Sequence, residues 1–353
     1  MIRSRLLHPR LLSTSPSTTS RYRLRLSTLA FLTTTSVLVS SYFLWPSKYR
    51  GSPTFNHQPL SPSYFIPVTV SENSQAGPDL AVLTLSIPPD SHPLDKHTSS
   101  LDPIWSIFIK DDDIQVERPY TPLFGIGKDG VIKLWVKRYP RGEVGRWLHS
   151  KQAGDTIEIR GPLKTFPFHQ GKWDEVVMIS GGTGFSPFHQ LLFRQLLRGN
   201  VAASTRFTLL HASRTLAELP PLSLLQPLID FAVAHPEHLR LALFVDGASR
   251  ALAPKSIVKH LEAGRIDKSS IGHTLGIPDG AWSWSSWISN LWTSGQPKIG
   301  DSDIRKKNVL VLVCGPEPMV ATIAGPYGRN YSQGKVGGVL AELGFKAGQV
   351  WKL

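Results

Sequence analysis

The chain has 353 residues, of which 41% are hydrophobic and 18% are charged. This composition supports ordinary buried cores and excludes wholesale disorder, and the length suits about two domains. The single cysteine, Cys314, excludes an intramolecular disulfide framework and any zinc or iron–sulfur site that needs several cysteines. We therefore predict no metal site.

The formal net charge of +13 is concentrated near the N-terminus. Residues 1–50 hold eight Arg or Lys and no acidic residue, which leaves 31 basic against 26 acidic residues in 51–353. Because the rest of the chain is nearly balanced, its charge does not indicate a nucleic-acid partner.

Residues 1–50 have the composition of a mitochondrial leader, rich in Arg, Ser, Thr and Leu and free of acids. Within them, residues 26–45 are uncharged and long enough to span a bilayer as a helix, with basic residues on both sides. We predict a transmembrane anchor in the mitochondrial inner membrane, with the catalytic part in the intermembrane space. The alternative is a cleaved leader that leaves no anchor. Residues 51–63 contain three prolines and are predicted to be a linker.

Residues 64–170 contain short β-branched or alternating runs separated by Gly, Pro and Asp. This pattern predicts an antiparallel barrel or sandwich. The runs are 64–70, 80–87, 105–110, 131–139 and 156–159. The G-x-G-x-x-G spacing of 125–130 precedes a predicted strand directly, so we interpret it as a hairpin turn rather than a dinucleotide site.

Residues 174–353 contain uniformly apolar runs at 175–180, 207–210, 241–245 and 309–313, which predict a parallel sheet with crossover helices. The first run leads into Gly181-Gly182-Thr183-Gly184 and then a helix from Ser186-Pro187 to Leu197. A strand, a glycine turn and a helix together bind anions. Cys314-Gly315-Pro316 follows the last of these runs, so we expect both turns to border one cleft.

Taken in order, these motifs resemble the ferredoxin–NADP reductase superfamily, and within it the NADH–cytochrome b5 reductases. The motifs are RPYTPL (118–123), KLWVKRYPRGEVGRWL (133–148), GDTIEIRGPL (154–163), ISGGTGFSP (179–187) and VCGPEPM (313–319). The resemblance implies an antiparallel six-stranded FAD-binding barrel over 64–170, then a parallel-sheet NAD(P)-binding α/β domain over 174–353. It also implies an FAD-dependent NAD(P)H oxidoreductase that uses NADH or NADPH.

The resemblance assigns the FAD contacts to three segments. Arg118 would pair with a phosphate, which suits a guanidinium fork, while Tyr120 and Thr121 would lie against the isoalloxazine. Val136, Lys137 and Tyr139 match the second flavin strand. The family's Gly-x-x-Ser segment begins at Gly142 but has Gly145 in place of the serine. We expect the backbone N–H groups of 144–146 and the charge of Arg146 to serve instead.

The nicotinamide side is assigned to the two turns. The residues involved are Gly181, Gly182, Gly184, Pro187, Cys314, Gly315, Pro316 and Met319, whereas Thr183 of the first turn would touch the flavin. Trp351 matches the family's terminal aromatic, and it lies either by the flavin or the nicotinamide pocket or in the core as a residue of the last strand. No acid–base catalyst is expected, because the cofactors carry the hydride chemistry. Two Ser-Arg pairs, Ser213-Arg214 and Ser249-Arg250, leave the choice between NADH and NADPH open.

The electron acceptor is not indicated by the motifs. We expect a haem protein of the cytochrome b5 or cytochrome c type. A second hypothesis is a flavoprotein that reduces haem or apocytochrome during cytochrome c maturation, resembling a fungal inner-membrane flavoprotein. A third is a degenerate flavin-domain scaffold without turnover, supported by Gly145. An insertion at about 267–305 has four tryptophans in 281–292. It is either a hydrophobic patch suited to a partner or to a membrane interface, or a segment folded back on the domain.

Overall fold

The structure is a computed structural model that describes residues 52–92, 103–111, 116–198, 205–247, 252–275 and 308–353. Among these residues no helix is long and apolar enough to cross a membrane. The predicted leader and the predicted anchor at 26–45 lie outside the described residues. So do Ser249, Arg250 and the four clustered tryptophans of 281–292.

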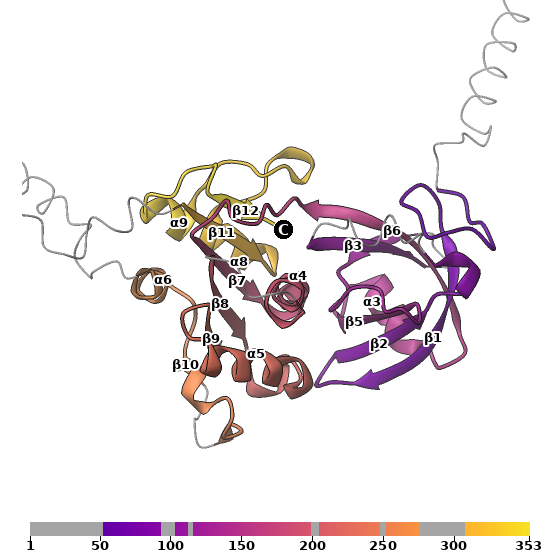
Figure 1. Ribbon diagram of the computed structural model, residues 1–353, viewed down its shortest axis with the longest axis horizontal. Helices are drawn as coiled ribbons and strands as arrows, with labels where there is room; N and C mark the ends of the chain where they lie inside the picture. The colour runs from indigo at the N-terminus through magenta and orange to yellow at the C-terminus, as the bar shows by residue number, and fades with distance from the viewer. Residues whose placement is uncertain (1–51, 93–102, 112–115, 199–204, 248–251, 276–307) are drawn as a thin grey trace, which may run out of the picture. The chain divides into compact units, whose positions relative to one another are not determined.

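The first half of the described chain is a six-stranded antiparallel sheet with the order β4-β3-β6-β1-β2-β5 (Figure 1). Its strands are β1 (Ile66–Gln75), β2 (Leu80–Ser86), β3 (Ile104–Lys110), β4 (Glu117–Tyr120), β5 (Val131–Lys137) and β6 (Thr156–Phe166). Leu123, just after β4, donates its N–H to the carbonyl of Lys133 in β5 at 2.9 Å. This bond joins the two edges of the sheet, and the predicted barrel fold is confirmed.

Side chains that alternate along these strands fill the barrel. The fully buried Ile66, Val68 and Val70 of β1 pack with Ile107 and Ile109 of β3. The short helix α3 (Glu143–Ser150) closes one end by burying Val144 and Leu148 in the same core. The barrel thus has its own hydrophobic core, and α3 is fixed to it by two of its own residues.

The stretch that we predicted as a linker packs against the barrel. Phe55 and Phe65 share a backbone hydrogen bond of 2.9 Å, and Leu60 is buried with its N–H bonded to Ser91 of the 3-10 turn η1 (Pro89–Ser91). Lys110 Nζ donates to Thr54 Oγ1 at 3.1 Å. From residue 53 onward the chain is therefore held by apolar and polar contacts, despite its prolines.

The G-x-G-x-x-G segment is a tight turn that leads into β5. Gly130 N donates to Gly127 O at 2.9 Å, and Gly127 N donates to Val131 O at 3.1 Å. Gly130 has a φ of +74°, which favours glycine. The interpretation as a hairpin turn is confirmed.

The second half is a six-stranded parallel sheet with the order β10-β9-β8-β7-β11-β12 (Figure 1). Its strands are β7 (Glu175–Gly181), β8 (Arg206–Ser213), β9 (Leu239–Val245), β10 (Leu261–Ala263), β11 (Val309–Cys314) and β12 (Val350–Lys352). The helical segments are η2 (Gly182–Phe185), α4 (Ser186–Leu192), the π-helical η3 (Phe193–Leu197), η4 (Leu216–Glu218), α5 (Leu222–Ala234), η6 (Val258–His260), α6 (Lys268–Thr274), α8 (Glu317–Ala324), η8 (Arg329–Tyr331) and α9 (Gly338–Glu342). The predicted parallel α/β fold is confirmed.

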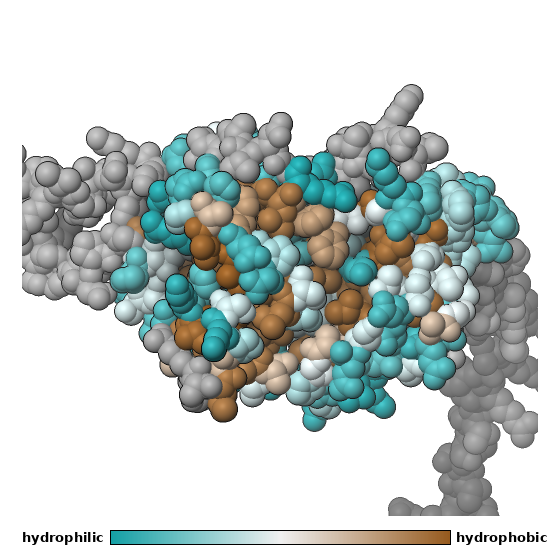
Figure 2. Space-filling view, turned by 60° about the horizontal axis from the view of Figure 1, so that its bottom comes forward, coloured by the Kyte–Doolittle hydropathy of each residue, from teal (hydrophilic) through white to brown (hydrophobic). Residues whose placement is uncertain are grey.

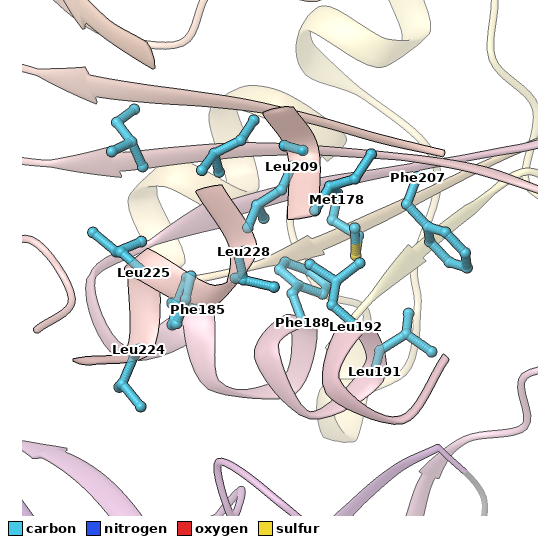
Figure 3. Close-up of a cluster of buried hydrophobic side chains, with 14 of the residues drawn as sticks. Met178, Phe185, Phe188, Leu191, Leu192, Phe207, Leu209, Leu224, Leu225 and Leu228 are labelled. Atoms are coloured by element: carbon cyan, nitrogen blue, oxygen red, sulfur yellow. The ribbon is translucent and has the colours of Figure 1, made fainter. Parts of the chain in front are cut away.

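Both faces of this sheet are covered, which explains why its strands are apolar throughout. Val176 and Met178 of β7 face the side of α4 and α5, whereas Val177 and Ile179 face the side of α6, α8 and α9. Figure 3 shows the first face, where Phe185, Phe188 and the leucines of α4 and α5 pack onto the strands.

The two halves share the core on the α4 side of the sheet. Leu80, Ile104, Leu123 and Trp135 of the barrel belong to the same buried cluster as the residues of α4 and α5. Figure 1 shows α4 lying between the parallel sheet and the barrel. In the space-filling view, apolar residues gather across the middle of the face and hydrophilic ones lie around them (Figure 2). Residues 53–353 therefore form one compact unit.

The start of the predicted insertion is part of the α/β core. Asp267 caps α6, where its side chain accepts a hydrogen bond from Ser270 N at 2.8 Å and Ser270 Oγ in turn accepts one from Asp267 N. Ile271 and Leu275 are buried against the sheet. The predicted boundary of about 267 is therefore wrong for α6, because Ile271 and Leu275, four residues apart, pack one face of this helix against the sheet.

Candidate functional site

A cavity of about 500 Å³ lies between the barrel and the carboxyl ends of the parallel strands. It is lined by residues of β3, β4, β5, β6 and α3 on the barrel side and of β7, η2, α4 and β11 on the other side. The lining residues are Ser106, Arg118, Pro119, Tyr120, Thr121, Trp135, Lys137, Tyr139, Arg141, Gly142, Glu143, Val144, Gly145, Thr165, Gly181, Thr183, Gly184, Ser186, Pro187, Cys314, Gly315, Pro316 and Leu353.

Fourteen of the eighteen sequence-predicted site residues line this one cavity. They are Arg118, Tyr120, Thr121, Lys137, Tyr139, Gly142, Gly145, Gly181, Thr183, Gly184, Pro187, Cys314, Gly315 and Pro316. Segments more than 190 residues apart in the chain, such as RPYT and CGP, thus meet at one place. The expectation that the GGTG and CGP turns border one cleft is confirmed.

The remaining four predicted residues do not line the cavity. The Val136 side chain is buried in the barrel core, so only its backbone is left for a cofactor. Arg146 is exposed, and its N–H donates to Gly142 O at 3.2 Å. The structure therefore does not support the expected contact of this N–H or of the Arg146 charge with the cofactor. Gly182 lies in the turn with a φ of +53°, and Met319 packs behind the turn against Gly181 and Gly315.

The barrel side of the cavity offers donors for a phosphate. Arg118 has one hydrogen bond among the described residues, from its Nη1 to Glu117 O at 2.9 Å, which leaves other guanidinium N–H groups to bind an anion. Gly142 and Gly145 bring the N-terminus of α3 to the cavity wall. The positive end of its peptide dipoles favours an anion there.

Gly145 suits the close packing of α3 on β5. A Cβ at this position would lie 3.0 Å from Lys137 O, closer than side chains ordinarily approach a carbonyl. Although the family serine is replaced by Gly145, the residue still borders the cavity.

Aromatic side chains provide the flat walls of the cavity. Burial raises the pKa of Tyr120 to about 12, against the opposing effect of the Arg118 charge, so its hydroxyl keeps its proton at neutral pH. Trp135 is 3% exposed, and its Nε1 is a buried donor without a partner among the described residues. Since a buried unpaired donor is costly, this N–H is suited to a ligand in the cavity that Trp135 lines.

On the opposite wall, the glycine turn and the CGP turn meet backbone to backbone. β7 and β11 are neighbouring parallel strands in which Ser180 pairs with Cys314. A Cβ on Gly184 would lie 2.4 Å from Cys314 O, so only glycine allows this approach. Burial raises the pKa of the Cys314 thiol to about 12, which makes it a neutral packing group rather than a nucleophile.

Trp351 in the last strand β12 and Leu353 just after it have different roles. Trp351 packs its ring against Phe166, with centroids 5.3 Å apart, and joins the shared core, so it is the core residue of the two alternatives. Leu353 borders the cavity instead and is held by Tyr327 Oη, which donates to Leu353 O at 2.8 Å.

Several lining residues were missed from the sequence. Trp135 precedes Lys137 and Tyr139 at intervals of two, so the alternation along β5 was enough to place it on their face. Arg141 and Glu143 lie inside the motif that contains Gly142. Ser106 and Thr165 had no such signal, because only the pairing of β3 with β6 brings them to the cavity.

Comparison with known proteins agrees with this geometry. Residues 67–168 match the family model described as the oxidoreductase FAD-binding domain. An uncharacterised FAD-binding protein of Schizosaccharomyces pombe is 30% identical over 83% of this chain and 86% of its own length. NADH-cytochrome b5 reductase 2 of Mycosarcoma maydis is 27% identical over 83% of this chain and 73% of its own length.

The fold is shared with a solved structure, the cytochrome b5 reductase domain of Ulva prolifera nitrate reductase. That match has a TM-score of 0.57 and 20% identity, and it covers 84% of this chain and all of that domain. The chain therefore belongs to the same family of FAD-binding proteins as the Schizosaccharomyces pombe relative. It is an FAD-dependent oxidoreductase.

The residues of the cavity fit FAD. Arg118 and the α3 N-terminus suit the pyrophosphate, and the orphaned Trp135 N–H and the Tyr120 hydroxyl suit the polar edge of a ring system. FAD, when bound, accepts a hydride from a nicotinamide and releases electrons one at a time. The protein's part would be to hold the two rings together, and the glycine at position 184 lets the two turns that border the cavity approach each other closely.

Proposed function

We propose that this protein is a reductase that takes a hydride from NADH onto FAD and passes electrons to a haem-protein acceptor. The observation that carries the proposal is the single cavity in which Arg118, Tyr120 and Thr121 face Thr183, Gly184 and Cys314. The likeness to proteins named NADH-cytochrome b5 reductase 2 supports NADH as donor and a cytochrome b5 type acceptor.

We further propose that the protein is anchored in the mitochondrial inner membrane and faces the intermembrane space. The support is the composition of residues 1–50 and the uncharged segment at 26–45. Protease treatment of mitoplasts should degrade the protein, and alkaline extraction should leave it in the membrane. Release by alkali, or protection in mitoplasts, would contradict this placement.

The acceptor is tested with the purified flavin-loaded protein. NADH should bleach the flavin spectrum and then reduce cytochrome b5, with NADPH as the matched alternative donor. A colourless protein, or a flavin that neither nucleotide bleaches, would exclude the reductase and favour a scaffold without turnover.

A second candidate is a redox partner in cytochrome c maturation, favoured by the four tryptophans in 281–292. It predicts a flavin that is bleached by NADH but reduces haem or apocytochrome c and not cytochrome b5. Deleting 281–292 should then abolish electron transfer to the acceptor and spare flavin bleaching. Loss of FAD on this deletion would show that the segment supports the fold instead.

A further inference from the structure

A series of buried and part-buried hydrogen bonds links the end of β7 to η4. Ser180 and His211 are register partners on β7 and β8, and Ser180 Oγ lies 2.8 Å from His211 Nδ1. His211 Nε2 lies 3.0 Å from Ser213 Oγ, and Ser213 Oγ donates to Glu218 O at 3.2 Å. His211 itself is fully buried.

The direction of every proton in this chain follows from its last bond. The hydroxyl of Ser213 donates its one hydrogen to the carbonyl of Glu218, so Ser213 Oγ accepts from His211 Nε2–H. The other ring nitrogen, Nδ1, then carries no hydrogen and accepts from the hydroxyl of Ser180 at 2.8 Å, a shorter contact than the 3.5 Å from Ser180 Oγ to Leu210 O. A neutral imidazole satisfies both neighbours, in agreement with the pKa of His211, which burial lowers to about 3.

These hydrogen bonds end at Glu218, whose carboxylate pairs with a lysine that lines the cavity. Glu218 Oε2 accepts from Lys137 Nζ at 2.6 Å, and Lys137 lines the cavity on the barrel side. The two side chains are 15% and 19% exposed, so the pair is largely shielded from water. The Ser213 bond fixes the end of η4 that carries the Glu218 carboxylate.

We propose that His211 is a positioning residue that holds Glu218 against Lys137, through Ser213, and so keeps the Lys137 ammonium paired. The proposal rests on the proposed function only for the identity of what the cavity binds. With Lys137 neutralised by Glu218, phosphate recognition in the cavity is left to Arg118 and Arg141.

Lysine labelling tests this relation directly. The flavin-loaded protein is exposed briefly to acetic anhydride, and the acetylation rate of each lysine is measured by mass spectrometry. We expect the rate at Lys137 to rise severalfold in His211→Phe, which keeps a buried ring but breaks both bonds. Glu218→Gln should give the same rise, and the double variant should label no faster than Glu218→Gln alone. His211→Gln, which keeps a neutral acceptor and donor, should label as the wild type does.

Lys133 is the internal control, because it is exposed on the same strand and should label equally in every variant. A rise at Lys133 together with Lys137 would mean general loosening and would overturn the proposal. The proposal would also be overturned if Glu218→Gln raised the labelling rate of Lys137 and His211→Phe left it at the wild-type rate. A double variant in which Lys137 labels faster than in Glu218→Gln would overturn it as well.

If His211→Phe does not fold, Ser213→Ala breaks the next bond outside the deep core and should give the same severalfold rise at Lys137; an unchanged rate there also overturns the proposal. The labelling needs no nucleotide and no acceptor. A wild-type flavin that NADH does not bleach would therefore overturn the proposed function and leave the labelling result standing.

Discussion

At the scale of single residues, the site depends on two glycines that bring backbones into contact. Gly184 approaches Cys314, and Gly145 approaches Lys137, in each case against a carbonyl oxygen. A carbonyl is part of a strand and cannot swing away as a flexible side chain can. Substitutions at these positions therefore change the shape of the cavity wall as well as its chemistry.

Gly184→Ala tests this at the nicotinamide side. Its Cβ would meet Cys314 O at 2.4 Å and Gly315 Cα at 2.8 Å, so the two turns must separate. We expect about 1–3 kcal/mol of lost stability from overpacking, together with loss of flavin bleaching by NADH. Urea unfolding and stopped-flow absorbance measure the two effects. Gly125→Ala is the control, because nothing lies within 4 Å of its Cβ position. Equal behaviour of the two variants would contradict the expectation.

The buried imidazole of His211 makes stability depend on pH. Its pKa is about 3 in the folded protein and near 6.5 when unfolded, so below pH 6.5 only the unfolded chain takes up the proton. This group therefore lowers stability as the pH falls from 6.5 towards 3, by up to about 1.4 kcal/mol per pH unit.

Replacing His211 with Gln removes this group from the titration. The free energy of unfolding of His211→Gln should fall less steeply with pH than that of the wild type, with a relative gain of about 2 kcal/mol between pH 6.5 and 5. Urea unfolding at several pH values measures it. His235→Gln, at the exposed end of α5, is the control. Parallel curves for His211→Gln and wild type would rule out the neutral buried ring.

At the scale of elements, α4 is the part that joins the two halves. Gln190 Oε1 accepts a hydrogen bond from Trp105 N at 2.8 Å, and His189 Nδ1 bonds to Leu123 O at 2.7 Å. Both partners belong to the barrel, whereas α4 begins directly after the glycine turn. The helix therefore sets the position of Thr183 and Gly184 relative to the barrel wall.

Gln190→Leu should weaken this joint. It leaves the buried N–H of Trp105 without an acceptor, which costs about 1–3 kcal/mol of unfolding free energy. The misplacement of the turn should also slow flavin bleaching by NADH. Gln226→Leu, whose amide bonds Asp230 at the surface of α5, should leave both measurements unchanged. A Gln190→Leu protein as stable as Gln226→Leu would show that α4 is held by apolar packing alone.

The elements that the sequence predicted are those with a strong local pattern. The apolar runs predict the strands β7, β8, β9 and β11, and the proline near its start predicts the helix α4. By contrast, the sequence places α6 in the predicted insertion, because the burial of this helix depends on contacts with strands far away in the chain. For the same reason Ser106, Thr165 and the His211 chain could not be predicted: pairing between strands brings these residues together.

At the scale of the molecule, the shared core makes the two halves one folding unit. Leu123 of the barrel side is fully buried in the cluster that contains Leu225 and Leu228 of α5. Neither half can keep this surface covered when the other unfolds. The protein is thus expected to unfold as a whole rather than one half at a time.

We expect flavin release, tryptophan fluorescence and far-ultraviolet circular dichroism to give one coincident unfolding transition. Leu123→Ala should shift all three midpoints equally, because it removes about 2–5 kcal/mol from the shared core. Two separate midpoints, or a shift seen by the flavin signal alone, would show that the halves are independent.

The protonated state of Cys314 has a consequence for damage by oxygen. Reduced flavins give peroxide when they meet oxygen, and the chain's only cysteine lies in the wall of the cavity where that happens. Peroxide attacks thiolates far faster than thiols, and the raised pKa of Cys314 keeps this sulfur in the thiol form at neutral pH. We therefore expect Cys314 to resist oxidation by peroxide formed in the cavity.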